Sequence, residues 1–139
     1  MIAYRRGNDL DLDAVIELYG ASTLGARRPV DERETMARML DHANLVITAW
    51  DGIGLVGIAR SLTDFAYVAY LSDLAVRLSH QRHGIGRALV RETRAAMGPR
   101  SKIVLLAAPA AADYYPKLGF THHPQAWVLR AEDPLPGGS

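Results

Sequence analysis

The chain has 139 residues, of which 49% are hydrophobic and 22% are charged, and its formal net charge at pH 7 is +1. This length suits a single domain with a buried core, and the composition is that of an ordinary globular protein. The near balance of charge argues against non-specific nucleic-acid binding, which needs a broad basic surface. No apolar run approaches the roughly 20 residues that span a bilayer, and the N-terminus lacks the layout of a signal peptide. We therefore expect a cytoplasmic protein without nucleic-acid or membrane partners.

The first part of the chain predicts a short strand and two helices. Residues 2–5 form the strand, and Asn8 or Asp9 can cap a helix that ends near Gly20. The apolar residues of this helix recur at helical spacing and are Leu12, Val15, Ile16 and Tyr19. After a loop over residues 21–30, Asp31 and Glu34 resemble a capping box for a second helix, which reaches about Ala43.

The middle of the chain predicts three consecutive strands. Residues 45–50 and 53–62 are apolar and rich in β-branched side chains, and Asp51 and Gly52 between them form a strong hairpin signal. A third strand follows over residues 65–76. Three strands in a meander imply an antiparallel sheet.

The last part of the chain predicts one further strand and a set of short elements. A helix that stops at Gly98 carries the chain to residues 102–107, which most simply add a parallel strand. A short helix over residues 109–118 should end at Gly119, which can adopt a left-handed conformation. Closing strands are expected at residues 120–122 and 126–130, before a flexible tail that begins at Pro134; residues 1–133 are then a single domain.

Two glycines, Gly84 and Gly86, lie where the third strand of the meander gives way to the following helix. Without a Cβ, the backbone there can come close to a ligand, and the first turn of the helix offers unpaired N–H groups to a phosphate. Arg82, His83 and Arg87 add positive charge around the same turn. The pattern predicts a phosphate-bearing cofactor held by the main chain, although a plain tight turn is the alternative. It fits neither the dinucleotide fingerprint nor the P-loop.

The residues around this turn follow the order Leu74-Ala75-Val76, a short linker, Gln81-x-x-Gly84-x-Gly86 and then Ala88-Leu89. This order resembles the acetyl-CoA-binding motif of the GNAT superfamily of N-acetyltransferases. The resemblance implies an α/β (α+β) GNAT fold, in which the fourth and fifth strands splay apart to admit pantetheine. The backbone of the strand would pair with the pantetheine amides as an added strand does. The cofactor residues that it implies are Leu74, Ala75, Val76, Gln81, Arg82, His83, Gly84, Ile85, Gly86, Arg87 and Ala88. Gln81 could bond either the turn or the cofactor.

A second stretch, Tyr-Pro-Lys-Leu-Gly-Phe from Tyr115 to Phe120, resembles the GNAT helix that carries the general acid. On this resemblance Tyr115 is a phenol hydrogen-bonded to the sulfur of the cofactor, and the neighbouring Tyr114 serves packing or cofactor contact. The alternative for any single tyrosine is a packing residue with a polar tip. The chain has no cysteine, which removes the side chain best suited to hold an acyl group. Transfer is therefore expected to be direct, within a ternary complex, although a serine or threonine ester is the alternative.

The chain departs from the family pattern at two positions. Tyr70 stands where some GNAT enzymes carry a glutamate base, and Ala108 stands where the family often carries an asparagine that binds pantetheine. Asp73 is the best remaining candidate for the base, and its alternative role is a hydrogen-bond acceptor at the strand end. Strand alternation places it on the face opposite to Leu74 and Val76. These departures keep open a non-catalytic acyl-CoA-binding or sensing module, and an interaction domain with a vestigial pocket.

The acceptor is a small-molecule or peptide amine that the sequence does not identify. Arg27, Arg28 and Arg33 lie in the helix–loop region that borders the acceptor site in the family, and they hint at an acidic acceptor. The family resemblance is compatible with a homodimer formed through the C-terminal strands. The oligomeric state stays open. Four of the five histidines are candidate metal ligands: His80, His83, His122 and His123. No carboxylate lies at a metalloprotease spacing beside them, so no metal site is expected.

Overall fold

The computed structural model describes residues 1–137 and divides into two compact units, one spanning Met1–Leu106 and the other starting at Ala107. The first unit holds a five-stranded sheet in the order β1-β2-β3-β4-β5. The strands are β1 Ile2–Arg6, β2 Leu45–Asp51, β3 Gly54–Thr63, β4 Val68–Val76 and β5 Lys102–Val104. Neighbouring strands are antiparallel from β1 to β4, and β5 runs parallel to β4. The structure thus confirms the mixed sheet with an antiparallel front.

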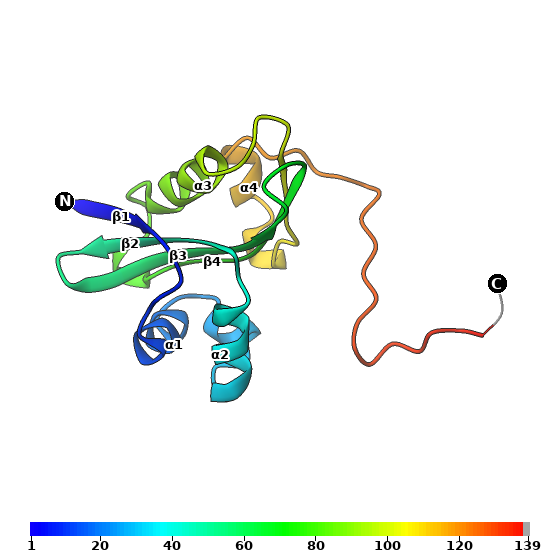
Figure 1. Cartoon of the computed structure of the whole chain (residues 1–139), viewed down its shortest axis with the longest axis horizontal. Coiled ribbons are helices and arrows are strands. Elements are labelled where there is room, and N and C mark those ends of the chain that lie inside the picture. The colour runs from blue at the N-terminus through cyan, green and yellow to red at the C-terminus, as the bar shows by residue number, and fades with distance from the viewer. Residues whose placement is uncertain (138–139) are drawn as a thin grey trace. The chain divides into compact units, whose positions relative to one another are not determined.

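Three helices of the first unit cover the two faces of the sheet (Figure 1). Helices α1 (Leu12–Gly20) and α2 (Arg33–Asp41) lie on one face, and α3 (Ile85–Ala95) lies on the other. Each face has its own apolar core. The first core is built around Leu18 and Met36, and the second around Leu71 and Leu89.

The two N-terminal helices begin later than the sequence predicts. Asp11 is the N-cap of α1 and accepts a hydrogen bond from the amide of Asp13, so the caps predicted at Asn8 and Asp9 are wrong. The predicted capping box of Asp31 and Glu34 is also wrong, because α2 begins after Glu32 and has no side-chain cap. The Glu32 amide instead donates to the Pro29 carbonyl, which places Asp31 inside a turn before the helix.

Both turns of the meander depend on local chemistry. Gly52 has a φ of +61°, as the predicted hairpin requires. In the next turn the Asp64 carboxylate accepts hydrogen bonds from three successive amides, of Ala66, Tyr67 and Val68. These amides are therefore held in the turn, and β4 begins at Val68 rather than at residue 65.

The second unit contains less regular structure than expected. The predicted helix over residues 109–118 is two pieces, a 3-10 turn Pro109–Ala111 and the short helix α4 Tyr114–Lys117. Gly119 has the predicted left-handed conformation, with a φ of +95°. The closing strands predicted at residues 120–122 and 126–130 do not form in the part of the chain that the structure describes.

Local turns take the place of those strands. The His123 ring accepts a hydrogen bond from the Gln125 amide, and the Asp133 amide donates to the Arg130 carbonyl. An apolar run such as residues 126–130 becomes a strand only where a neighbour completes the ladder, and these residues have none in the structure. Of the predicted tail, residues 138–139 lie outside the described residues.

Candidate functional site

The C-terminal half of β4 has an open edge. Strand β5 pairs with β4 only through Val68–Tyr70, which face Lys102–Val104. Beyond Tyr70, no strand of residues 1–106 pairs with this side of β4, although its other side stays paired with β3 as far as Val76. The two parallel strands therefore part, as the family resemblance predicts, and β5 is shorter than the predicted 102–107.

The main-chain groups of Leu74 and Val76 point to this edge. The Arg77 amide donates to the Val56 carbonyl of β3 at 2.8 Å. Because bonded residues alternate along an antiparallel ladder, Ala75 faces β3, whereas Leu74 and Val76 face away from it. The Gln81 side chain donates to the outward Val76 carbonyl at 3.1 Å, which ties the following turn to the strand.

The turn after β4 presents backbone amides. Gly84 and Arg82 are both left-handed, with φ values of +78° and +67°, and α3 begins at Ile85 without a side-chain cap. The first intrahelical bond runs from the Ala88 amide to the Gly84 carbonyl. The amides of residues 85–87 consequently have no acceptor within the helix and lie at the positive end of its dipole.

Side chains around this turn divide into buried anchors and exposed charges. Ile85 and Ala88 point into the core and are 3% and 5% exposed, so only their main chain can face a ligand. Arg82, His83 and Arg87 are exposed, and the two arginines carry positive charge at this turn. The His83 ring lies 3.3 Å from the His80 carbonyl.

Gly57 holds α3 close to the strands. A Cβ at this position would lie 3.1 Å from Leu89 and 3.2 Å from Ile85. Gly57 pairs with Val76 in the sheet. The open edge of β4 and the first turn of α3 therefore lie at the same end of the strand.

Asp73 lies next to the open edge but does not reach solvent. Its side chain is fully buried, and its Oδ1 accepts from Arg28 Nε at 2.6 Å. Its Oδ2 accepts from Arg60 Nε and from the Tyr19 hydroxyl, each at 2.6 Å. We call these four residues the Asp73 network. Sequence reasoning missed Arg60, although an arginine inside an apolar strand signals a buried acidic partner.

The electrostatics of this network favour an ionised carboxylate. Burial alone would raise the pKa of Asp73, but the charge and hydrogen bond of Arg60, with bonds from Tyr19 and Arg28, lower it below its usual value. Burial raises the pKa of the Tyr19 phenol, with a further contribution from Asp73, so Tyr19 acts as a donor. A carboxylate held this way is a weak proton acceptor, which favours the alternative role of Asp73 as a hydrogen-bond acceptor.

A β-bulge directs Asp73 to its partners. Arg60 of β3 pairs with Asp73 while the next residue, Ser61, pairs with Leu71, so Ser72 is the extra residue of β4. Leu71 therefore packs in the α3 core, whereas Asp73 faces α1. The alternation from Asp73 to Val76 is unbroken, which confirms the predicted opposite orientation of Asp73 and Val76.

Tyr115 belongs to the second unit, whereas Asp73 and the residues predicted to bind the cofactor belong to the first. Its ring makes edge contacts with Tyr114 and Phe120, at centroid distances of 5.3 and 5.5 Å. The Phe120 amide donates to the Tyr115 carbonyl at 3.1 Å. The Tyr-Pro-Lys-Leu-Gly-Phe stretch thus folds back on itself around the Tyr115 ring, and the catalytic role of Tyr115 stays a prediction.

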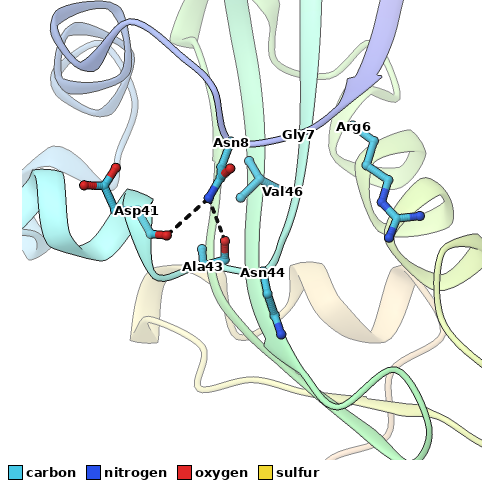
Figure 2. A pocket seen from close by; sticks show the side chains of 7 residues that line it. All are labelled: Arg6, Gly7, Asn8, Asp41, Ala43, Asn44 and Val46. Atoms are coloured by element: carbon cyan, nitrogen blue, oxygen red, sulfur yellow. Dashed lines mark hydrogen bonds between the residues drawn. The ribbon is translucent and has the colours of Figure 1, made fainter.

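Two other features of the described residues bear on the choice of site. A hollow beside β1 and α2 is spanned by Asn8, whose amide nitrogen donates to the carbonyls of Leu40, Asp41 and Ala43. Figure 2 shows the bonds to Asp41 and Ala43. Asn8 thereby joins the end of α2 to the start of β2, which is a structural role. Within residues 1–137 no cluster of three metal-ligating side chains occurs, and no helix is long and apolar enough to cross a bilayer.

Comparison with known proteins identifies this arrangement. The acetyltransferase (GNAT) domain family matches residues 42–122, more than half of the chain. The chain belongs to the GNAT acetyltransferase family. It is 36% identical over 73 residues to the chloroplastic GCN5-related N-acetyltransferase 2 of Arabidopsis thaliana, a match that covers 51% of this chain and 28% of that relative.

Solved GNAT structures share this fold. A GNAT-family acetyltransferase from Streptococcus pneumoniae is 25% identical, with a TM-score of 0.74 over 94% of this chain and 99% of that one. The aminoglycoside N-acetyltransferase AAC(6')-Iy, solved with CoA, is 18% identical, with a TM-score of 0.72 over 95% of both chains. These matches confirm the GNAT fold that the sequence predicts.

GNAT acetyltransferases use acetyl-CoA, and the observed site fits that cofactor. Leu74 and Val76 offer an unpaired strand edge that suits the amides of pantetheine, and the amides of residues 85–87 suit a diphosphate. At Gly84 a Cβ would meet nothing within 4 Å, so the left-handed φ rather than crowding explains the glycine. The predicted cofactor is thus confirmed, whereas the contribution of each residue is a proposal.

Proposed function

We propose that this GNAT acetyltransferase moves the acetyl group of acetyl-CoA directly to an amine acceptor within a ternary complex. The observation that carries the proposal is the parting of β4 from β5 after Tyr70, which leaves the outward edge of β4 at Leu74 and Val76 without a neighbouring strand of residues 1–106, beside the N-terminus of α3. An unpaired strand edge binds an extended amide chain as a further strand, and the helix end binds anionic phosphate. Bound acetyl-CoA supplies an activated thioester.

The residues around the turn have distinct roles in this proposal. Leu74, Ala75 and Val76 align the pantetheine arm along β4, and Gln81 fixes the Val76 carbonyl that ends this edge. The backbone from Arg82 to Ala88 holds the diphosphate, with exposed arginine side chains adding charge. Because these contacts come mainly from the main chain, we expect CoA binding to tolerate side-chain changes better than changes at Gly84.

Tyr115 is the proposed general acid. A departing thiolate has a pKa near 8.5 and a phenol near 10, so the phenol is only about 2 kcal/mol short of protonating it fully. A hydrogen bond from the phenol to the sulfur would strengthen as charge develops there. We expect no side-chain base on β4, because both oxygens of Asp73 already accept hydrogen bonds. The amine would then lose its proton to water.

The proposal is tested by following CoA thiol release from acetyl-CoA in the presence of a panel of amines. The panel includes an aminoglycoside, because that is the acceptor class named for some structural neighbours. We expect amine-dependent thiol release. Calorimetric binding of CoA without release for any amine would instead support the alternative, a non-catalytic acyl-CoA-binding module, which the residues Tyr70 and Ala108 at two family positions favour.

Replacing Tyr115 by phenylalanine tests the general acid. The change keeps the ring and its contacts with Tyr114 and Phe120 but removes the proton donor. We expect turnover to fall by about 10²-fold or more, with the CoA dissociation constant nearly unchanged. Tyr114→Phe is the matched control and should keep its turnover. Unchanged turnover in Tyr115→Phe would remove this residue from the mechanism. The cytoplasmic location and the homodimer stay predictions.

A further inference from the structure

The loop between α1 and α2 is hydrogen-bonded at two points that flank the open edge, one within β4 and one at Leu78, which follows it. At one point the Ala21 carbonyl accepts from the Leu78 amide at 2.9 Å. At the other, Arg28 donates through Nη2 to the Ser72 carbonyl at 2.8 Å, and through Nε to Asp73. Residues 21–28 therefore run beside the part of β4 that contains Leu74–Val76.

The three nitrogens of the Arg28 guanidinium all donate hydrogen bonds within the protein. Its third nitrogen, Nη1, donates to the Arg27 carbonyl at 2.9 Å, and only 23% of the side chain is exposed. All three nitrogens thus have protein acceptors, in the planar fork that an arginine offers and a lysine does not. This occupancy argues against the predicted use of Arg28 to bind an acidic acceptor directly.

The Asp73 network connects this fastening to the rest of the first unit. Arg60, on the other oxygen of Asp73, also donates to the Met39 carbonyl of α2 and to the Ser72 hydroxyl. Tyr19 brings α1 to the same carboxylate. A single buried carboxylate therefore joins both helices, the loop and the bulge of β4, and Arg28 is its only partner from the loop among the described residues.

Apolar packing holds this loop at Leu24 and Val30, which are partly buried against the core of α1 and α2, whereas Arg28 ties the segment between them to β4. The regular structure of the loop is a single 3-10 turn, Gly25–Arg27, none of whose residues is buried. Loops with few buried contacts open with low free energies. Without Arg28, the segment between Leu24 and Val30 would lose its hydrogen bonds to β4 and could move away from the strand.

We infer that Arg28 is a positioning residue that acts through Asp73. By holding residues 21–28 against the bulge, it fixes one wall of the open edge and so determines how the acceptor amine fits, without touching the cofactor. This inference rests on the proposed function, because it assigns the loop wall to the acceptor side of the same site.

The test compares Arg28→Gln with Arg27→Gln, a matched control whose side chain is exposed and whose carbonyl remains in place. Hydrogen exchange of the free protein reports on the loop directly. We expect the amides of residues 24–28 to exchange about tenfold faster or more in Arg28→Gln, because charged hydrogen bonds are lost, and at the wild-type rate in Arg27→Gln. Exchange at the wild-type rate in both variants would overturn the inference.

Kinetics and titration with CoA then separate positioning from direct binding. With sisomicin, spermidine and a dipeptide as acceptors, Arg28→Gln should raise KM about tenfold for every acceptor that wild type uses. The CoA dissociation constant should stay unchanged. A rise confined to the acceptor that carries a carboxylate, with normal loop exchange, would show direct binding and overturn the inference. Arg28→Lys, which keeps the charge but loses the fork, should lie between Arg28→Gln and wild type.

The two proposals fail in different ways. If wild type releases no thiol with any acceptor but loop exchange still rises in Arg28→Gln, the proposed function fails while the fastening by Arg28 stands. If wild type is active and Arg28→Gln has normal KM values, the positioning role fails alone. As a second variant, Asp73→Asn should reproduce the KM effect, whereas a fall in turnover with unchanged KM would make Asp73 a base and overturn the inference.

Discussion

Asp64 and Asp73 both have lowered pKa values, for different physical reasons. Asp73 is buried among arginines, whereas Asp64 is exposed and accepts from the amides of Tyr67, Ala66 and Val68 at 2.8, 2.9 and 3.1 Å. These backbone bonds lower the pKa of Asp64 to about 2. Because amide donors do not titrate, Asp64 is the only group in these three hydrogen bonds whose ionisation can change with pH.

Replacing Asp64 by alanine should therefore destabilise the protein in a pH-dependent way. The three amides lose their acceptor, and we expect the melting temperature at pH 7 to fall by a few degrees. A lowered folded-state pKa stabilises the fold above the unfolded value near 3.9, and this stability is lost as the pH falls through about 2. Melting curves of wild type and Asp64→Ala should thus approach each other between about pH 4 and pH 2. A constant difference would show that the ionised form is not responsible.

At the scale of elements, the sequence predicts what local patterns determine. The hairpin at Asp51-Gly52 and the apolar strands follow from turn chemistry and alternation, and the structure confirms them. The turn at Gly84 before α3 was equally predictable, because a glycine pattern between strand and helix depends on nearby residues only. The start of α1 was harder to predict. Asn8 could have capped it but instead bonds carbonyls at the end of α2.

The features that escaped prediction depend on partners far along the chain. The bulge at Ser72 exists only relative to the register of β3, so β4 alone carries no sign of it. Asp73 is separated by 45 residues from Arg28 and by 54 from Tyr19, and only the fold brings them together. The strands predicted at residues 120–122 and 126–130 do not form. Here too the outcome depends on distant residues, because an apolar run becomes a strand only where another strand pairs with it.

Helix α3 offers a test of how packing positions its own first turn and the preceding turn at residues 82–84. Valine at Gly57 would place methyl groups where a Cβ already lies 3.1 Å from Leu89 and 3.2 Å from Ile85. We expect overpacking to reduce the free energy of unfolding by about 1–3 kcal/mol. It should also weaken CoA binding, because displacing α3 moves the amides of residues 85–87 away from the edge of β4.

Urea unfolding and calorimetric titration with CoA check this prediction. Gly20→Ala is the control, since a Cβ at Gly20, the last residue of α1, meets nothing within 4 Å. Alanine there should leave CoA binding unchanged and alter stability by about 1 kcal/mol or less. Normal CoA affinity in a destabilised Gly57→Val protein would show that the position of α3 does not control binding.

At the scale of the molecule, three carboxylates join elements that are distant in the chain, and each has a lowered pKa. Glu17 of α1 pairs with Arg77 at 2.6 and 2.7 Å, which lowers its pKa through that hydrogen bond. The hydrogen bond to His80 likewise lowers the pKa of Asp51 at the hairpin. Asp73 differs because it is buried and faces two arginines. Of the three carboxylates, we expect Asp73 to contribute most to the free energy of unfolding, since exposed ion pairs stabilise little.

Asp73→Asn should therefore lower the free energy of unfolding at pH 7 by about 3–5 kcal/mol, because it leaves Arg28 and Arg60 without their counter-charge. The lowered pKa of Asp73 means that the wild-type advantage is present above the unfolded value and is lost as the pH falls through the folded value. At low pH the protonated wild type has the same uncompensated arginines as the variant, so urea unfolding curves of the two proteins should converge there. Glu17→Gln, at an exposed pair, should change stability by less than about 1 kcal/mol at pH 7. If Asp73→Asn were as stable as wild type at pH 7, the network would not hold the first unit together, and the acid sensitivity of the fold would have to come from its surface pairs.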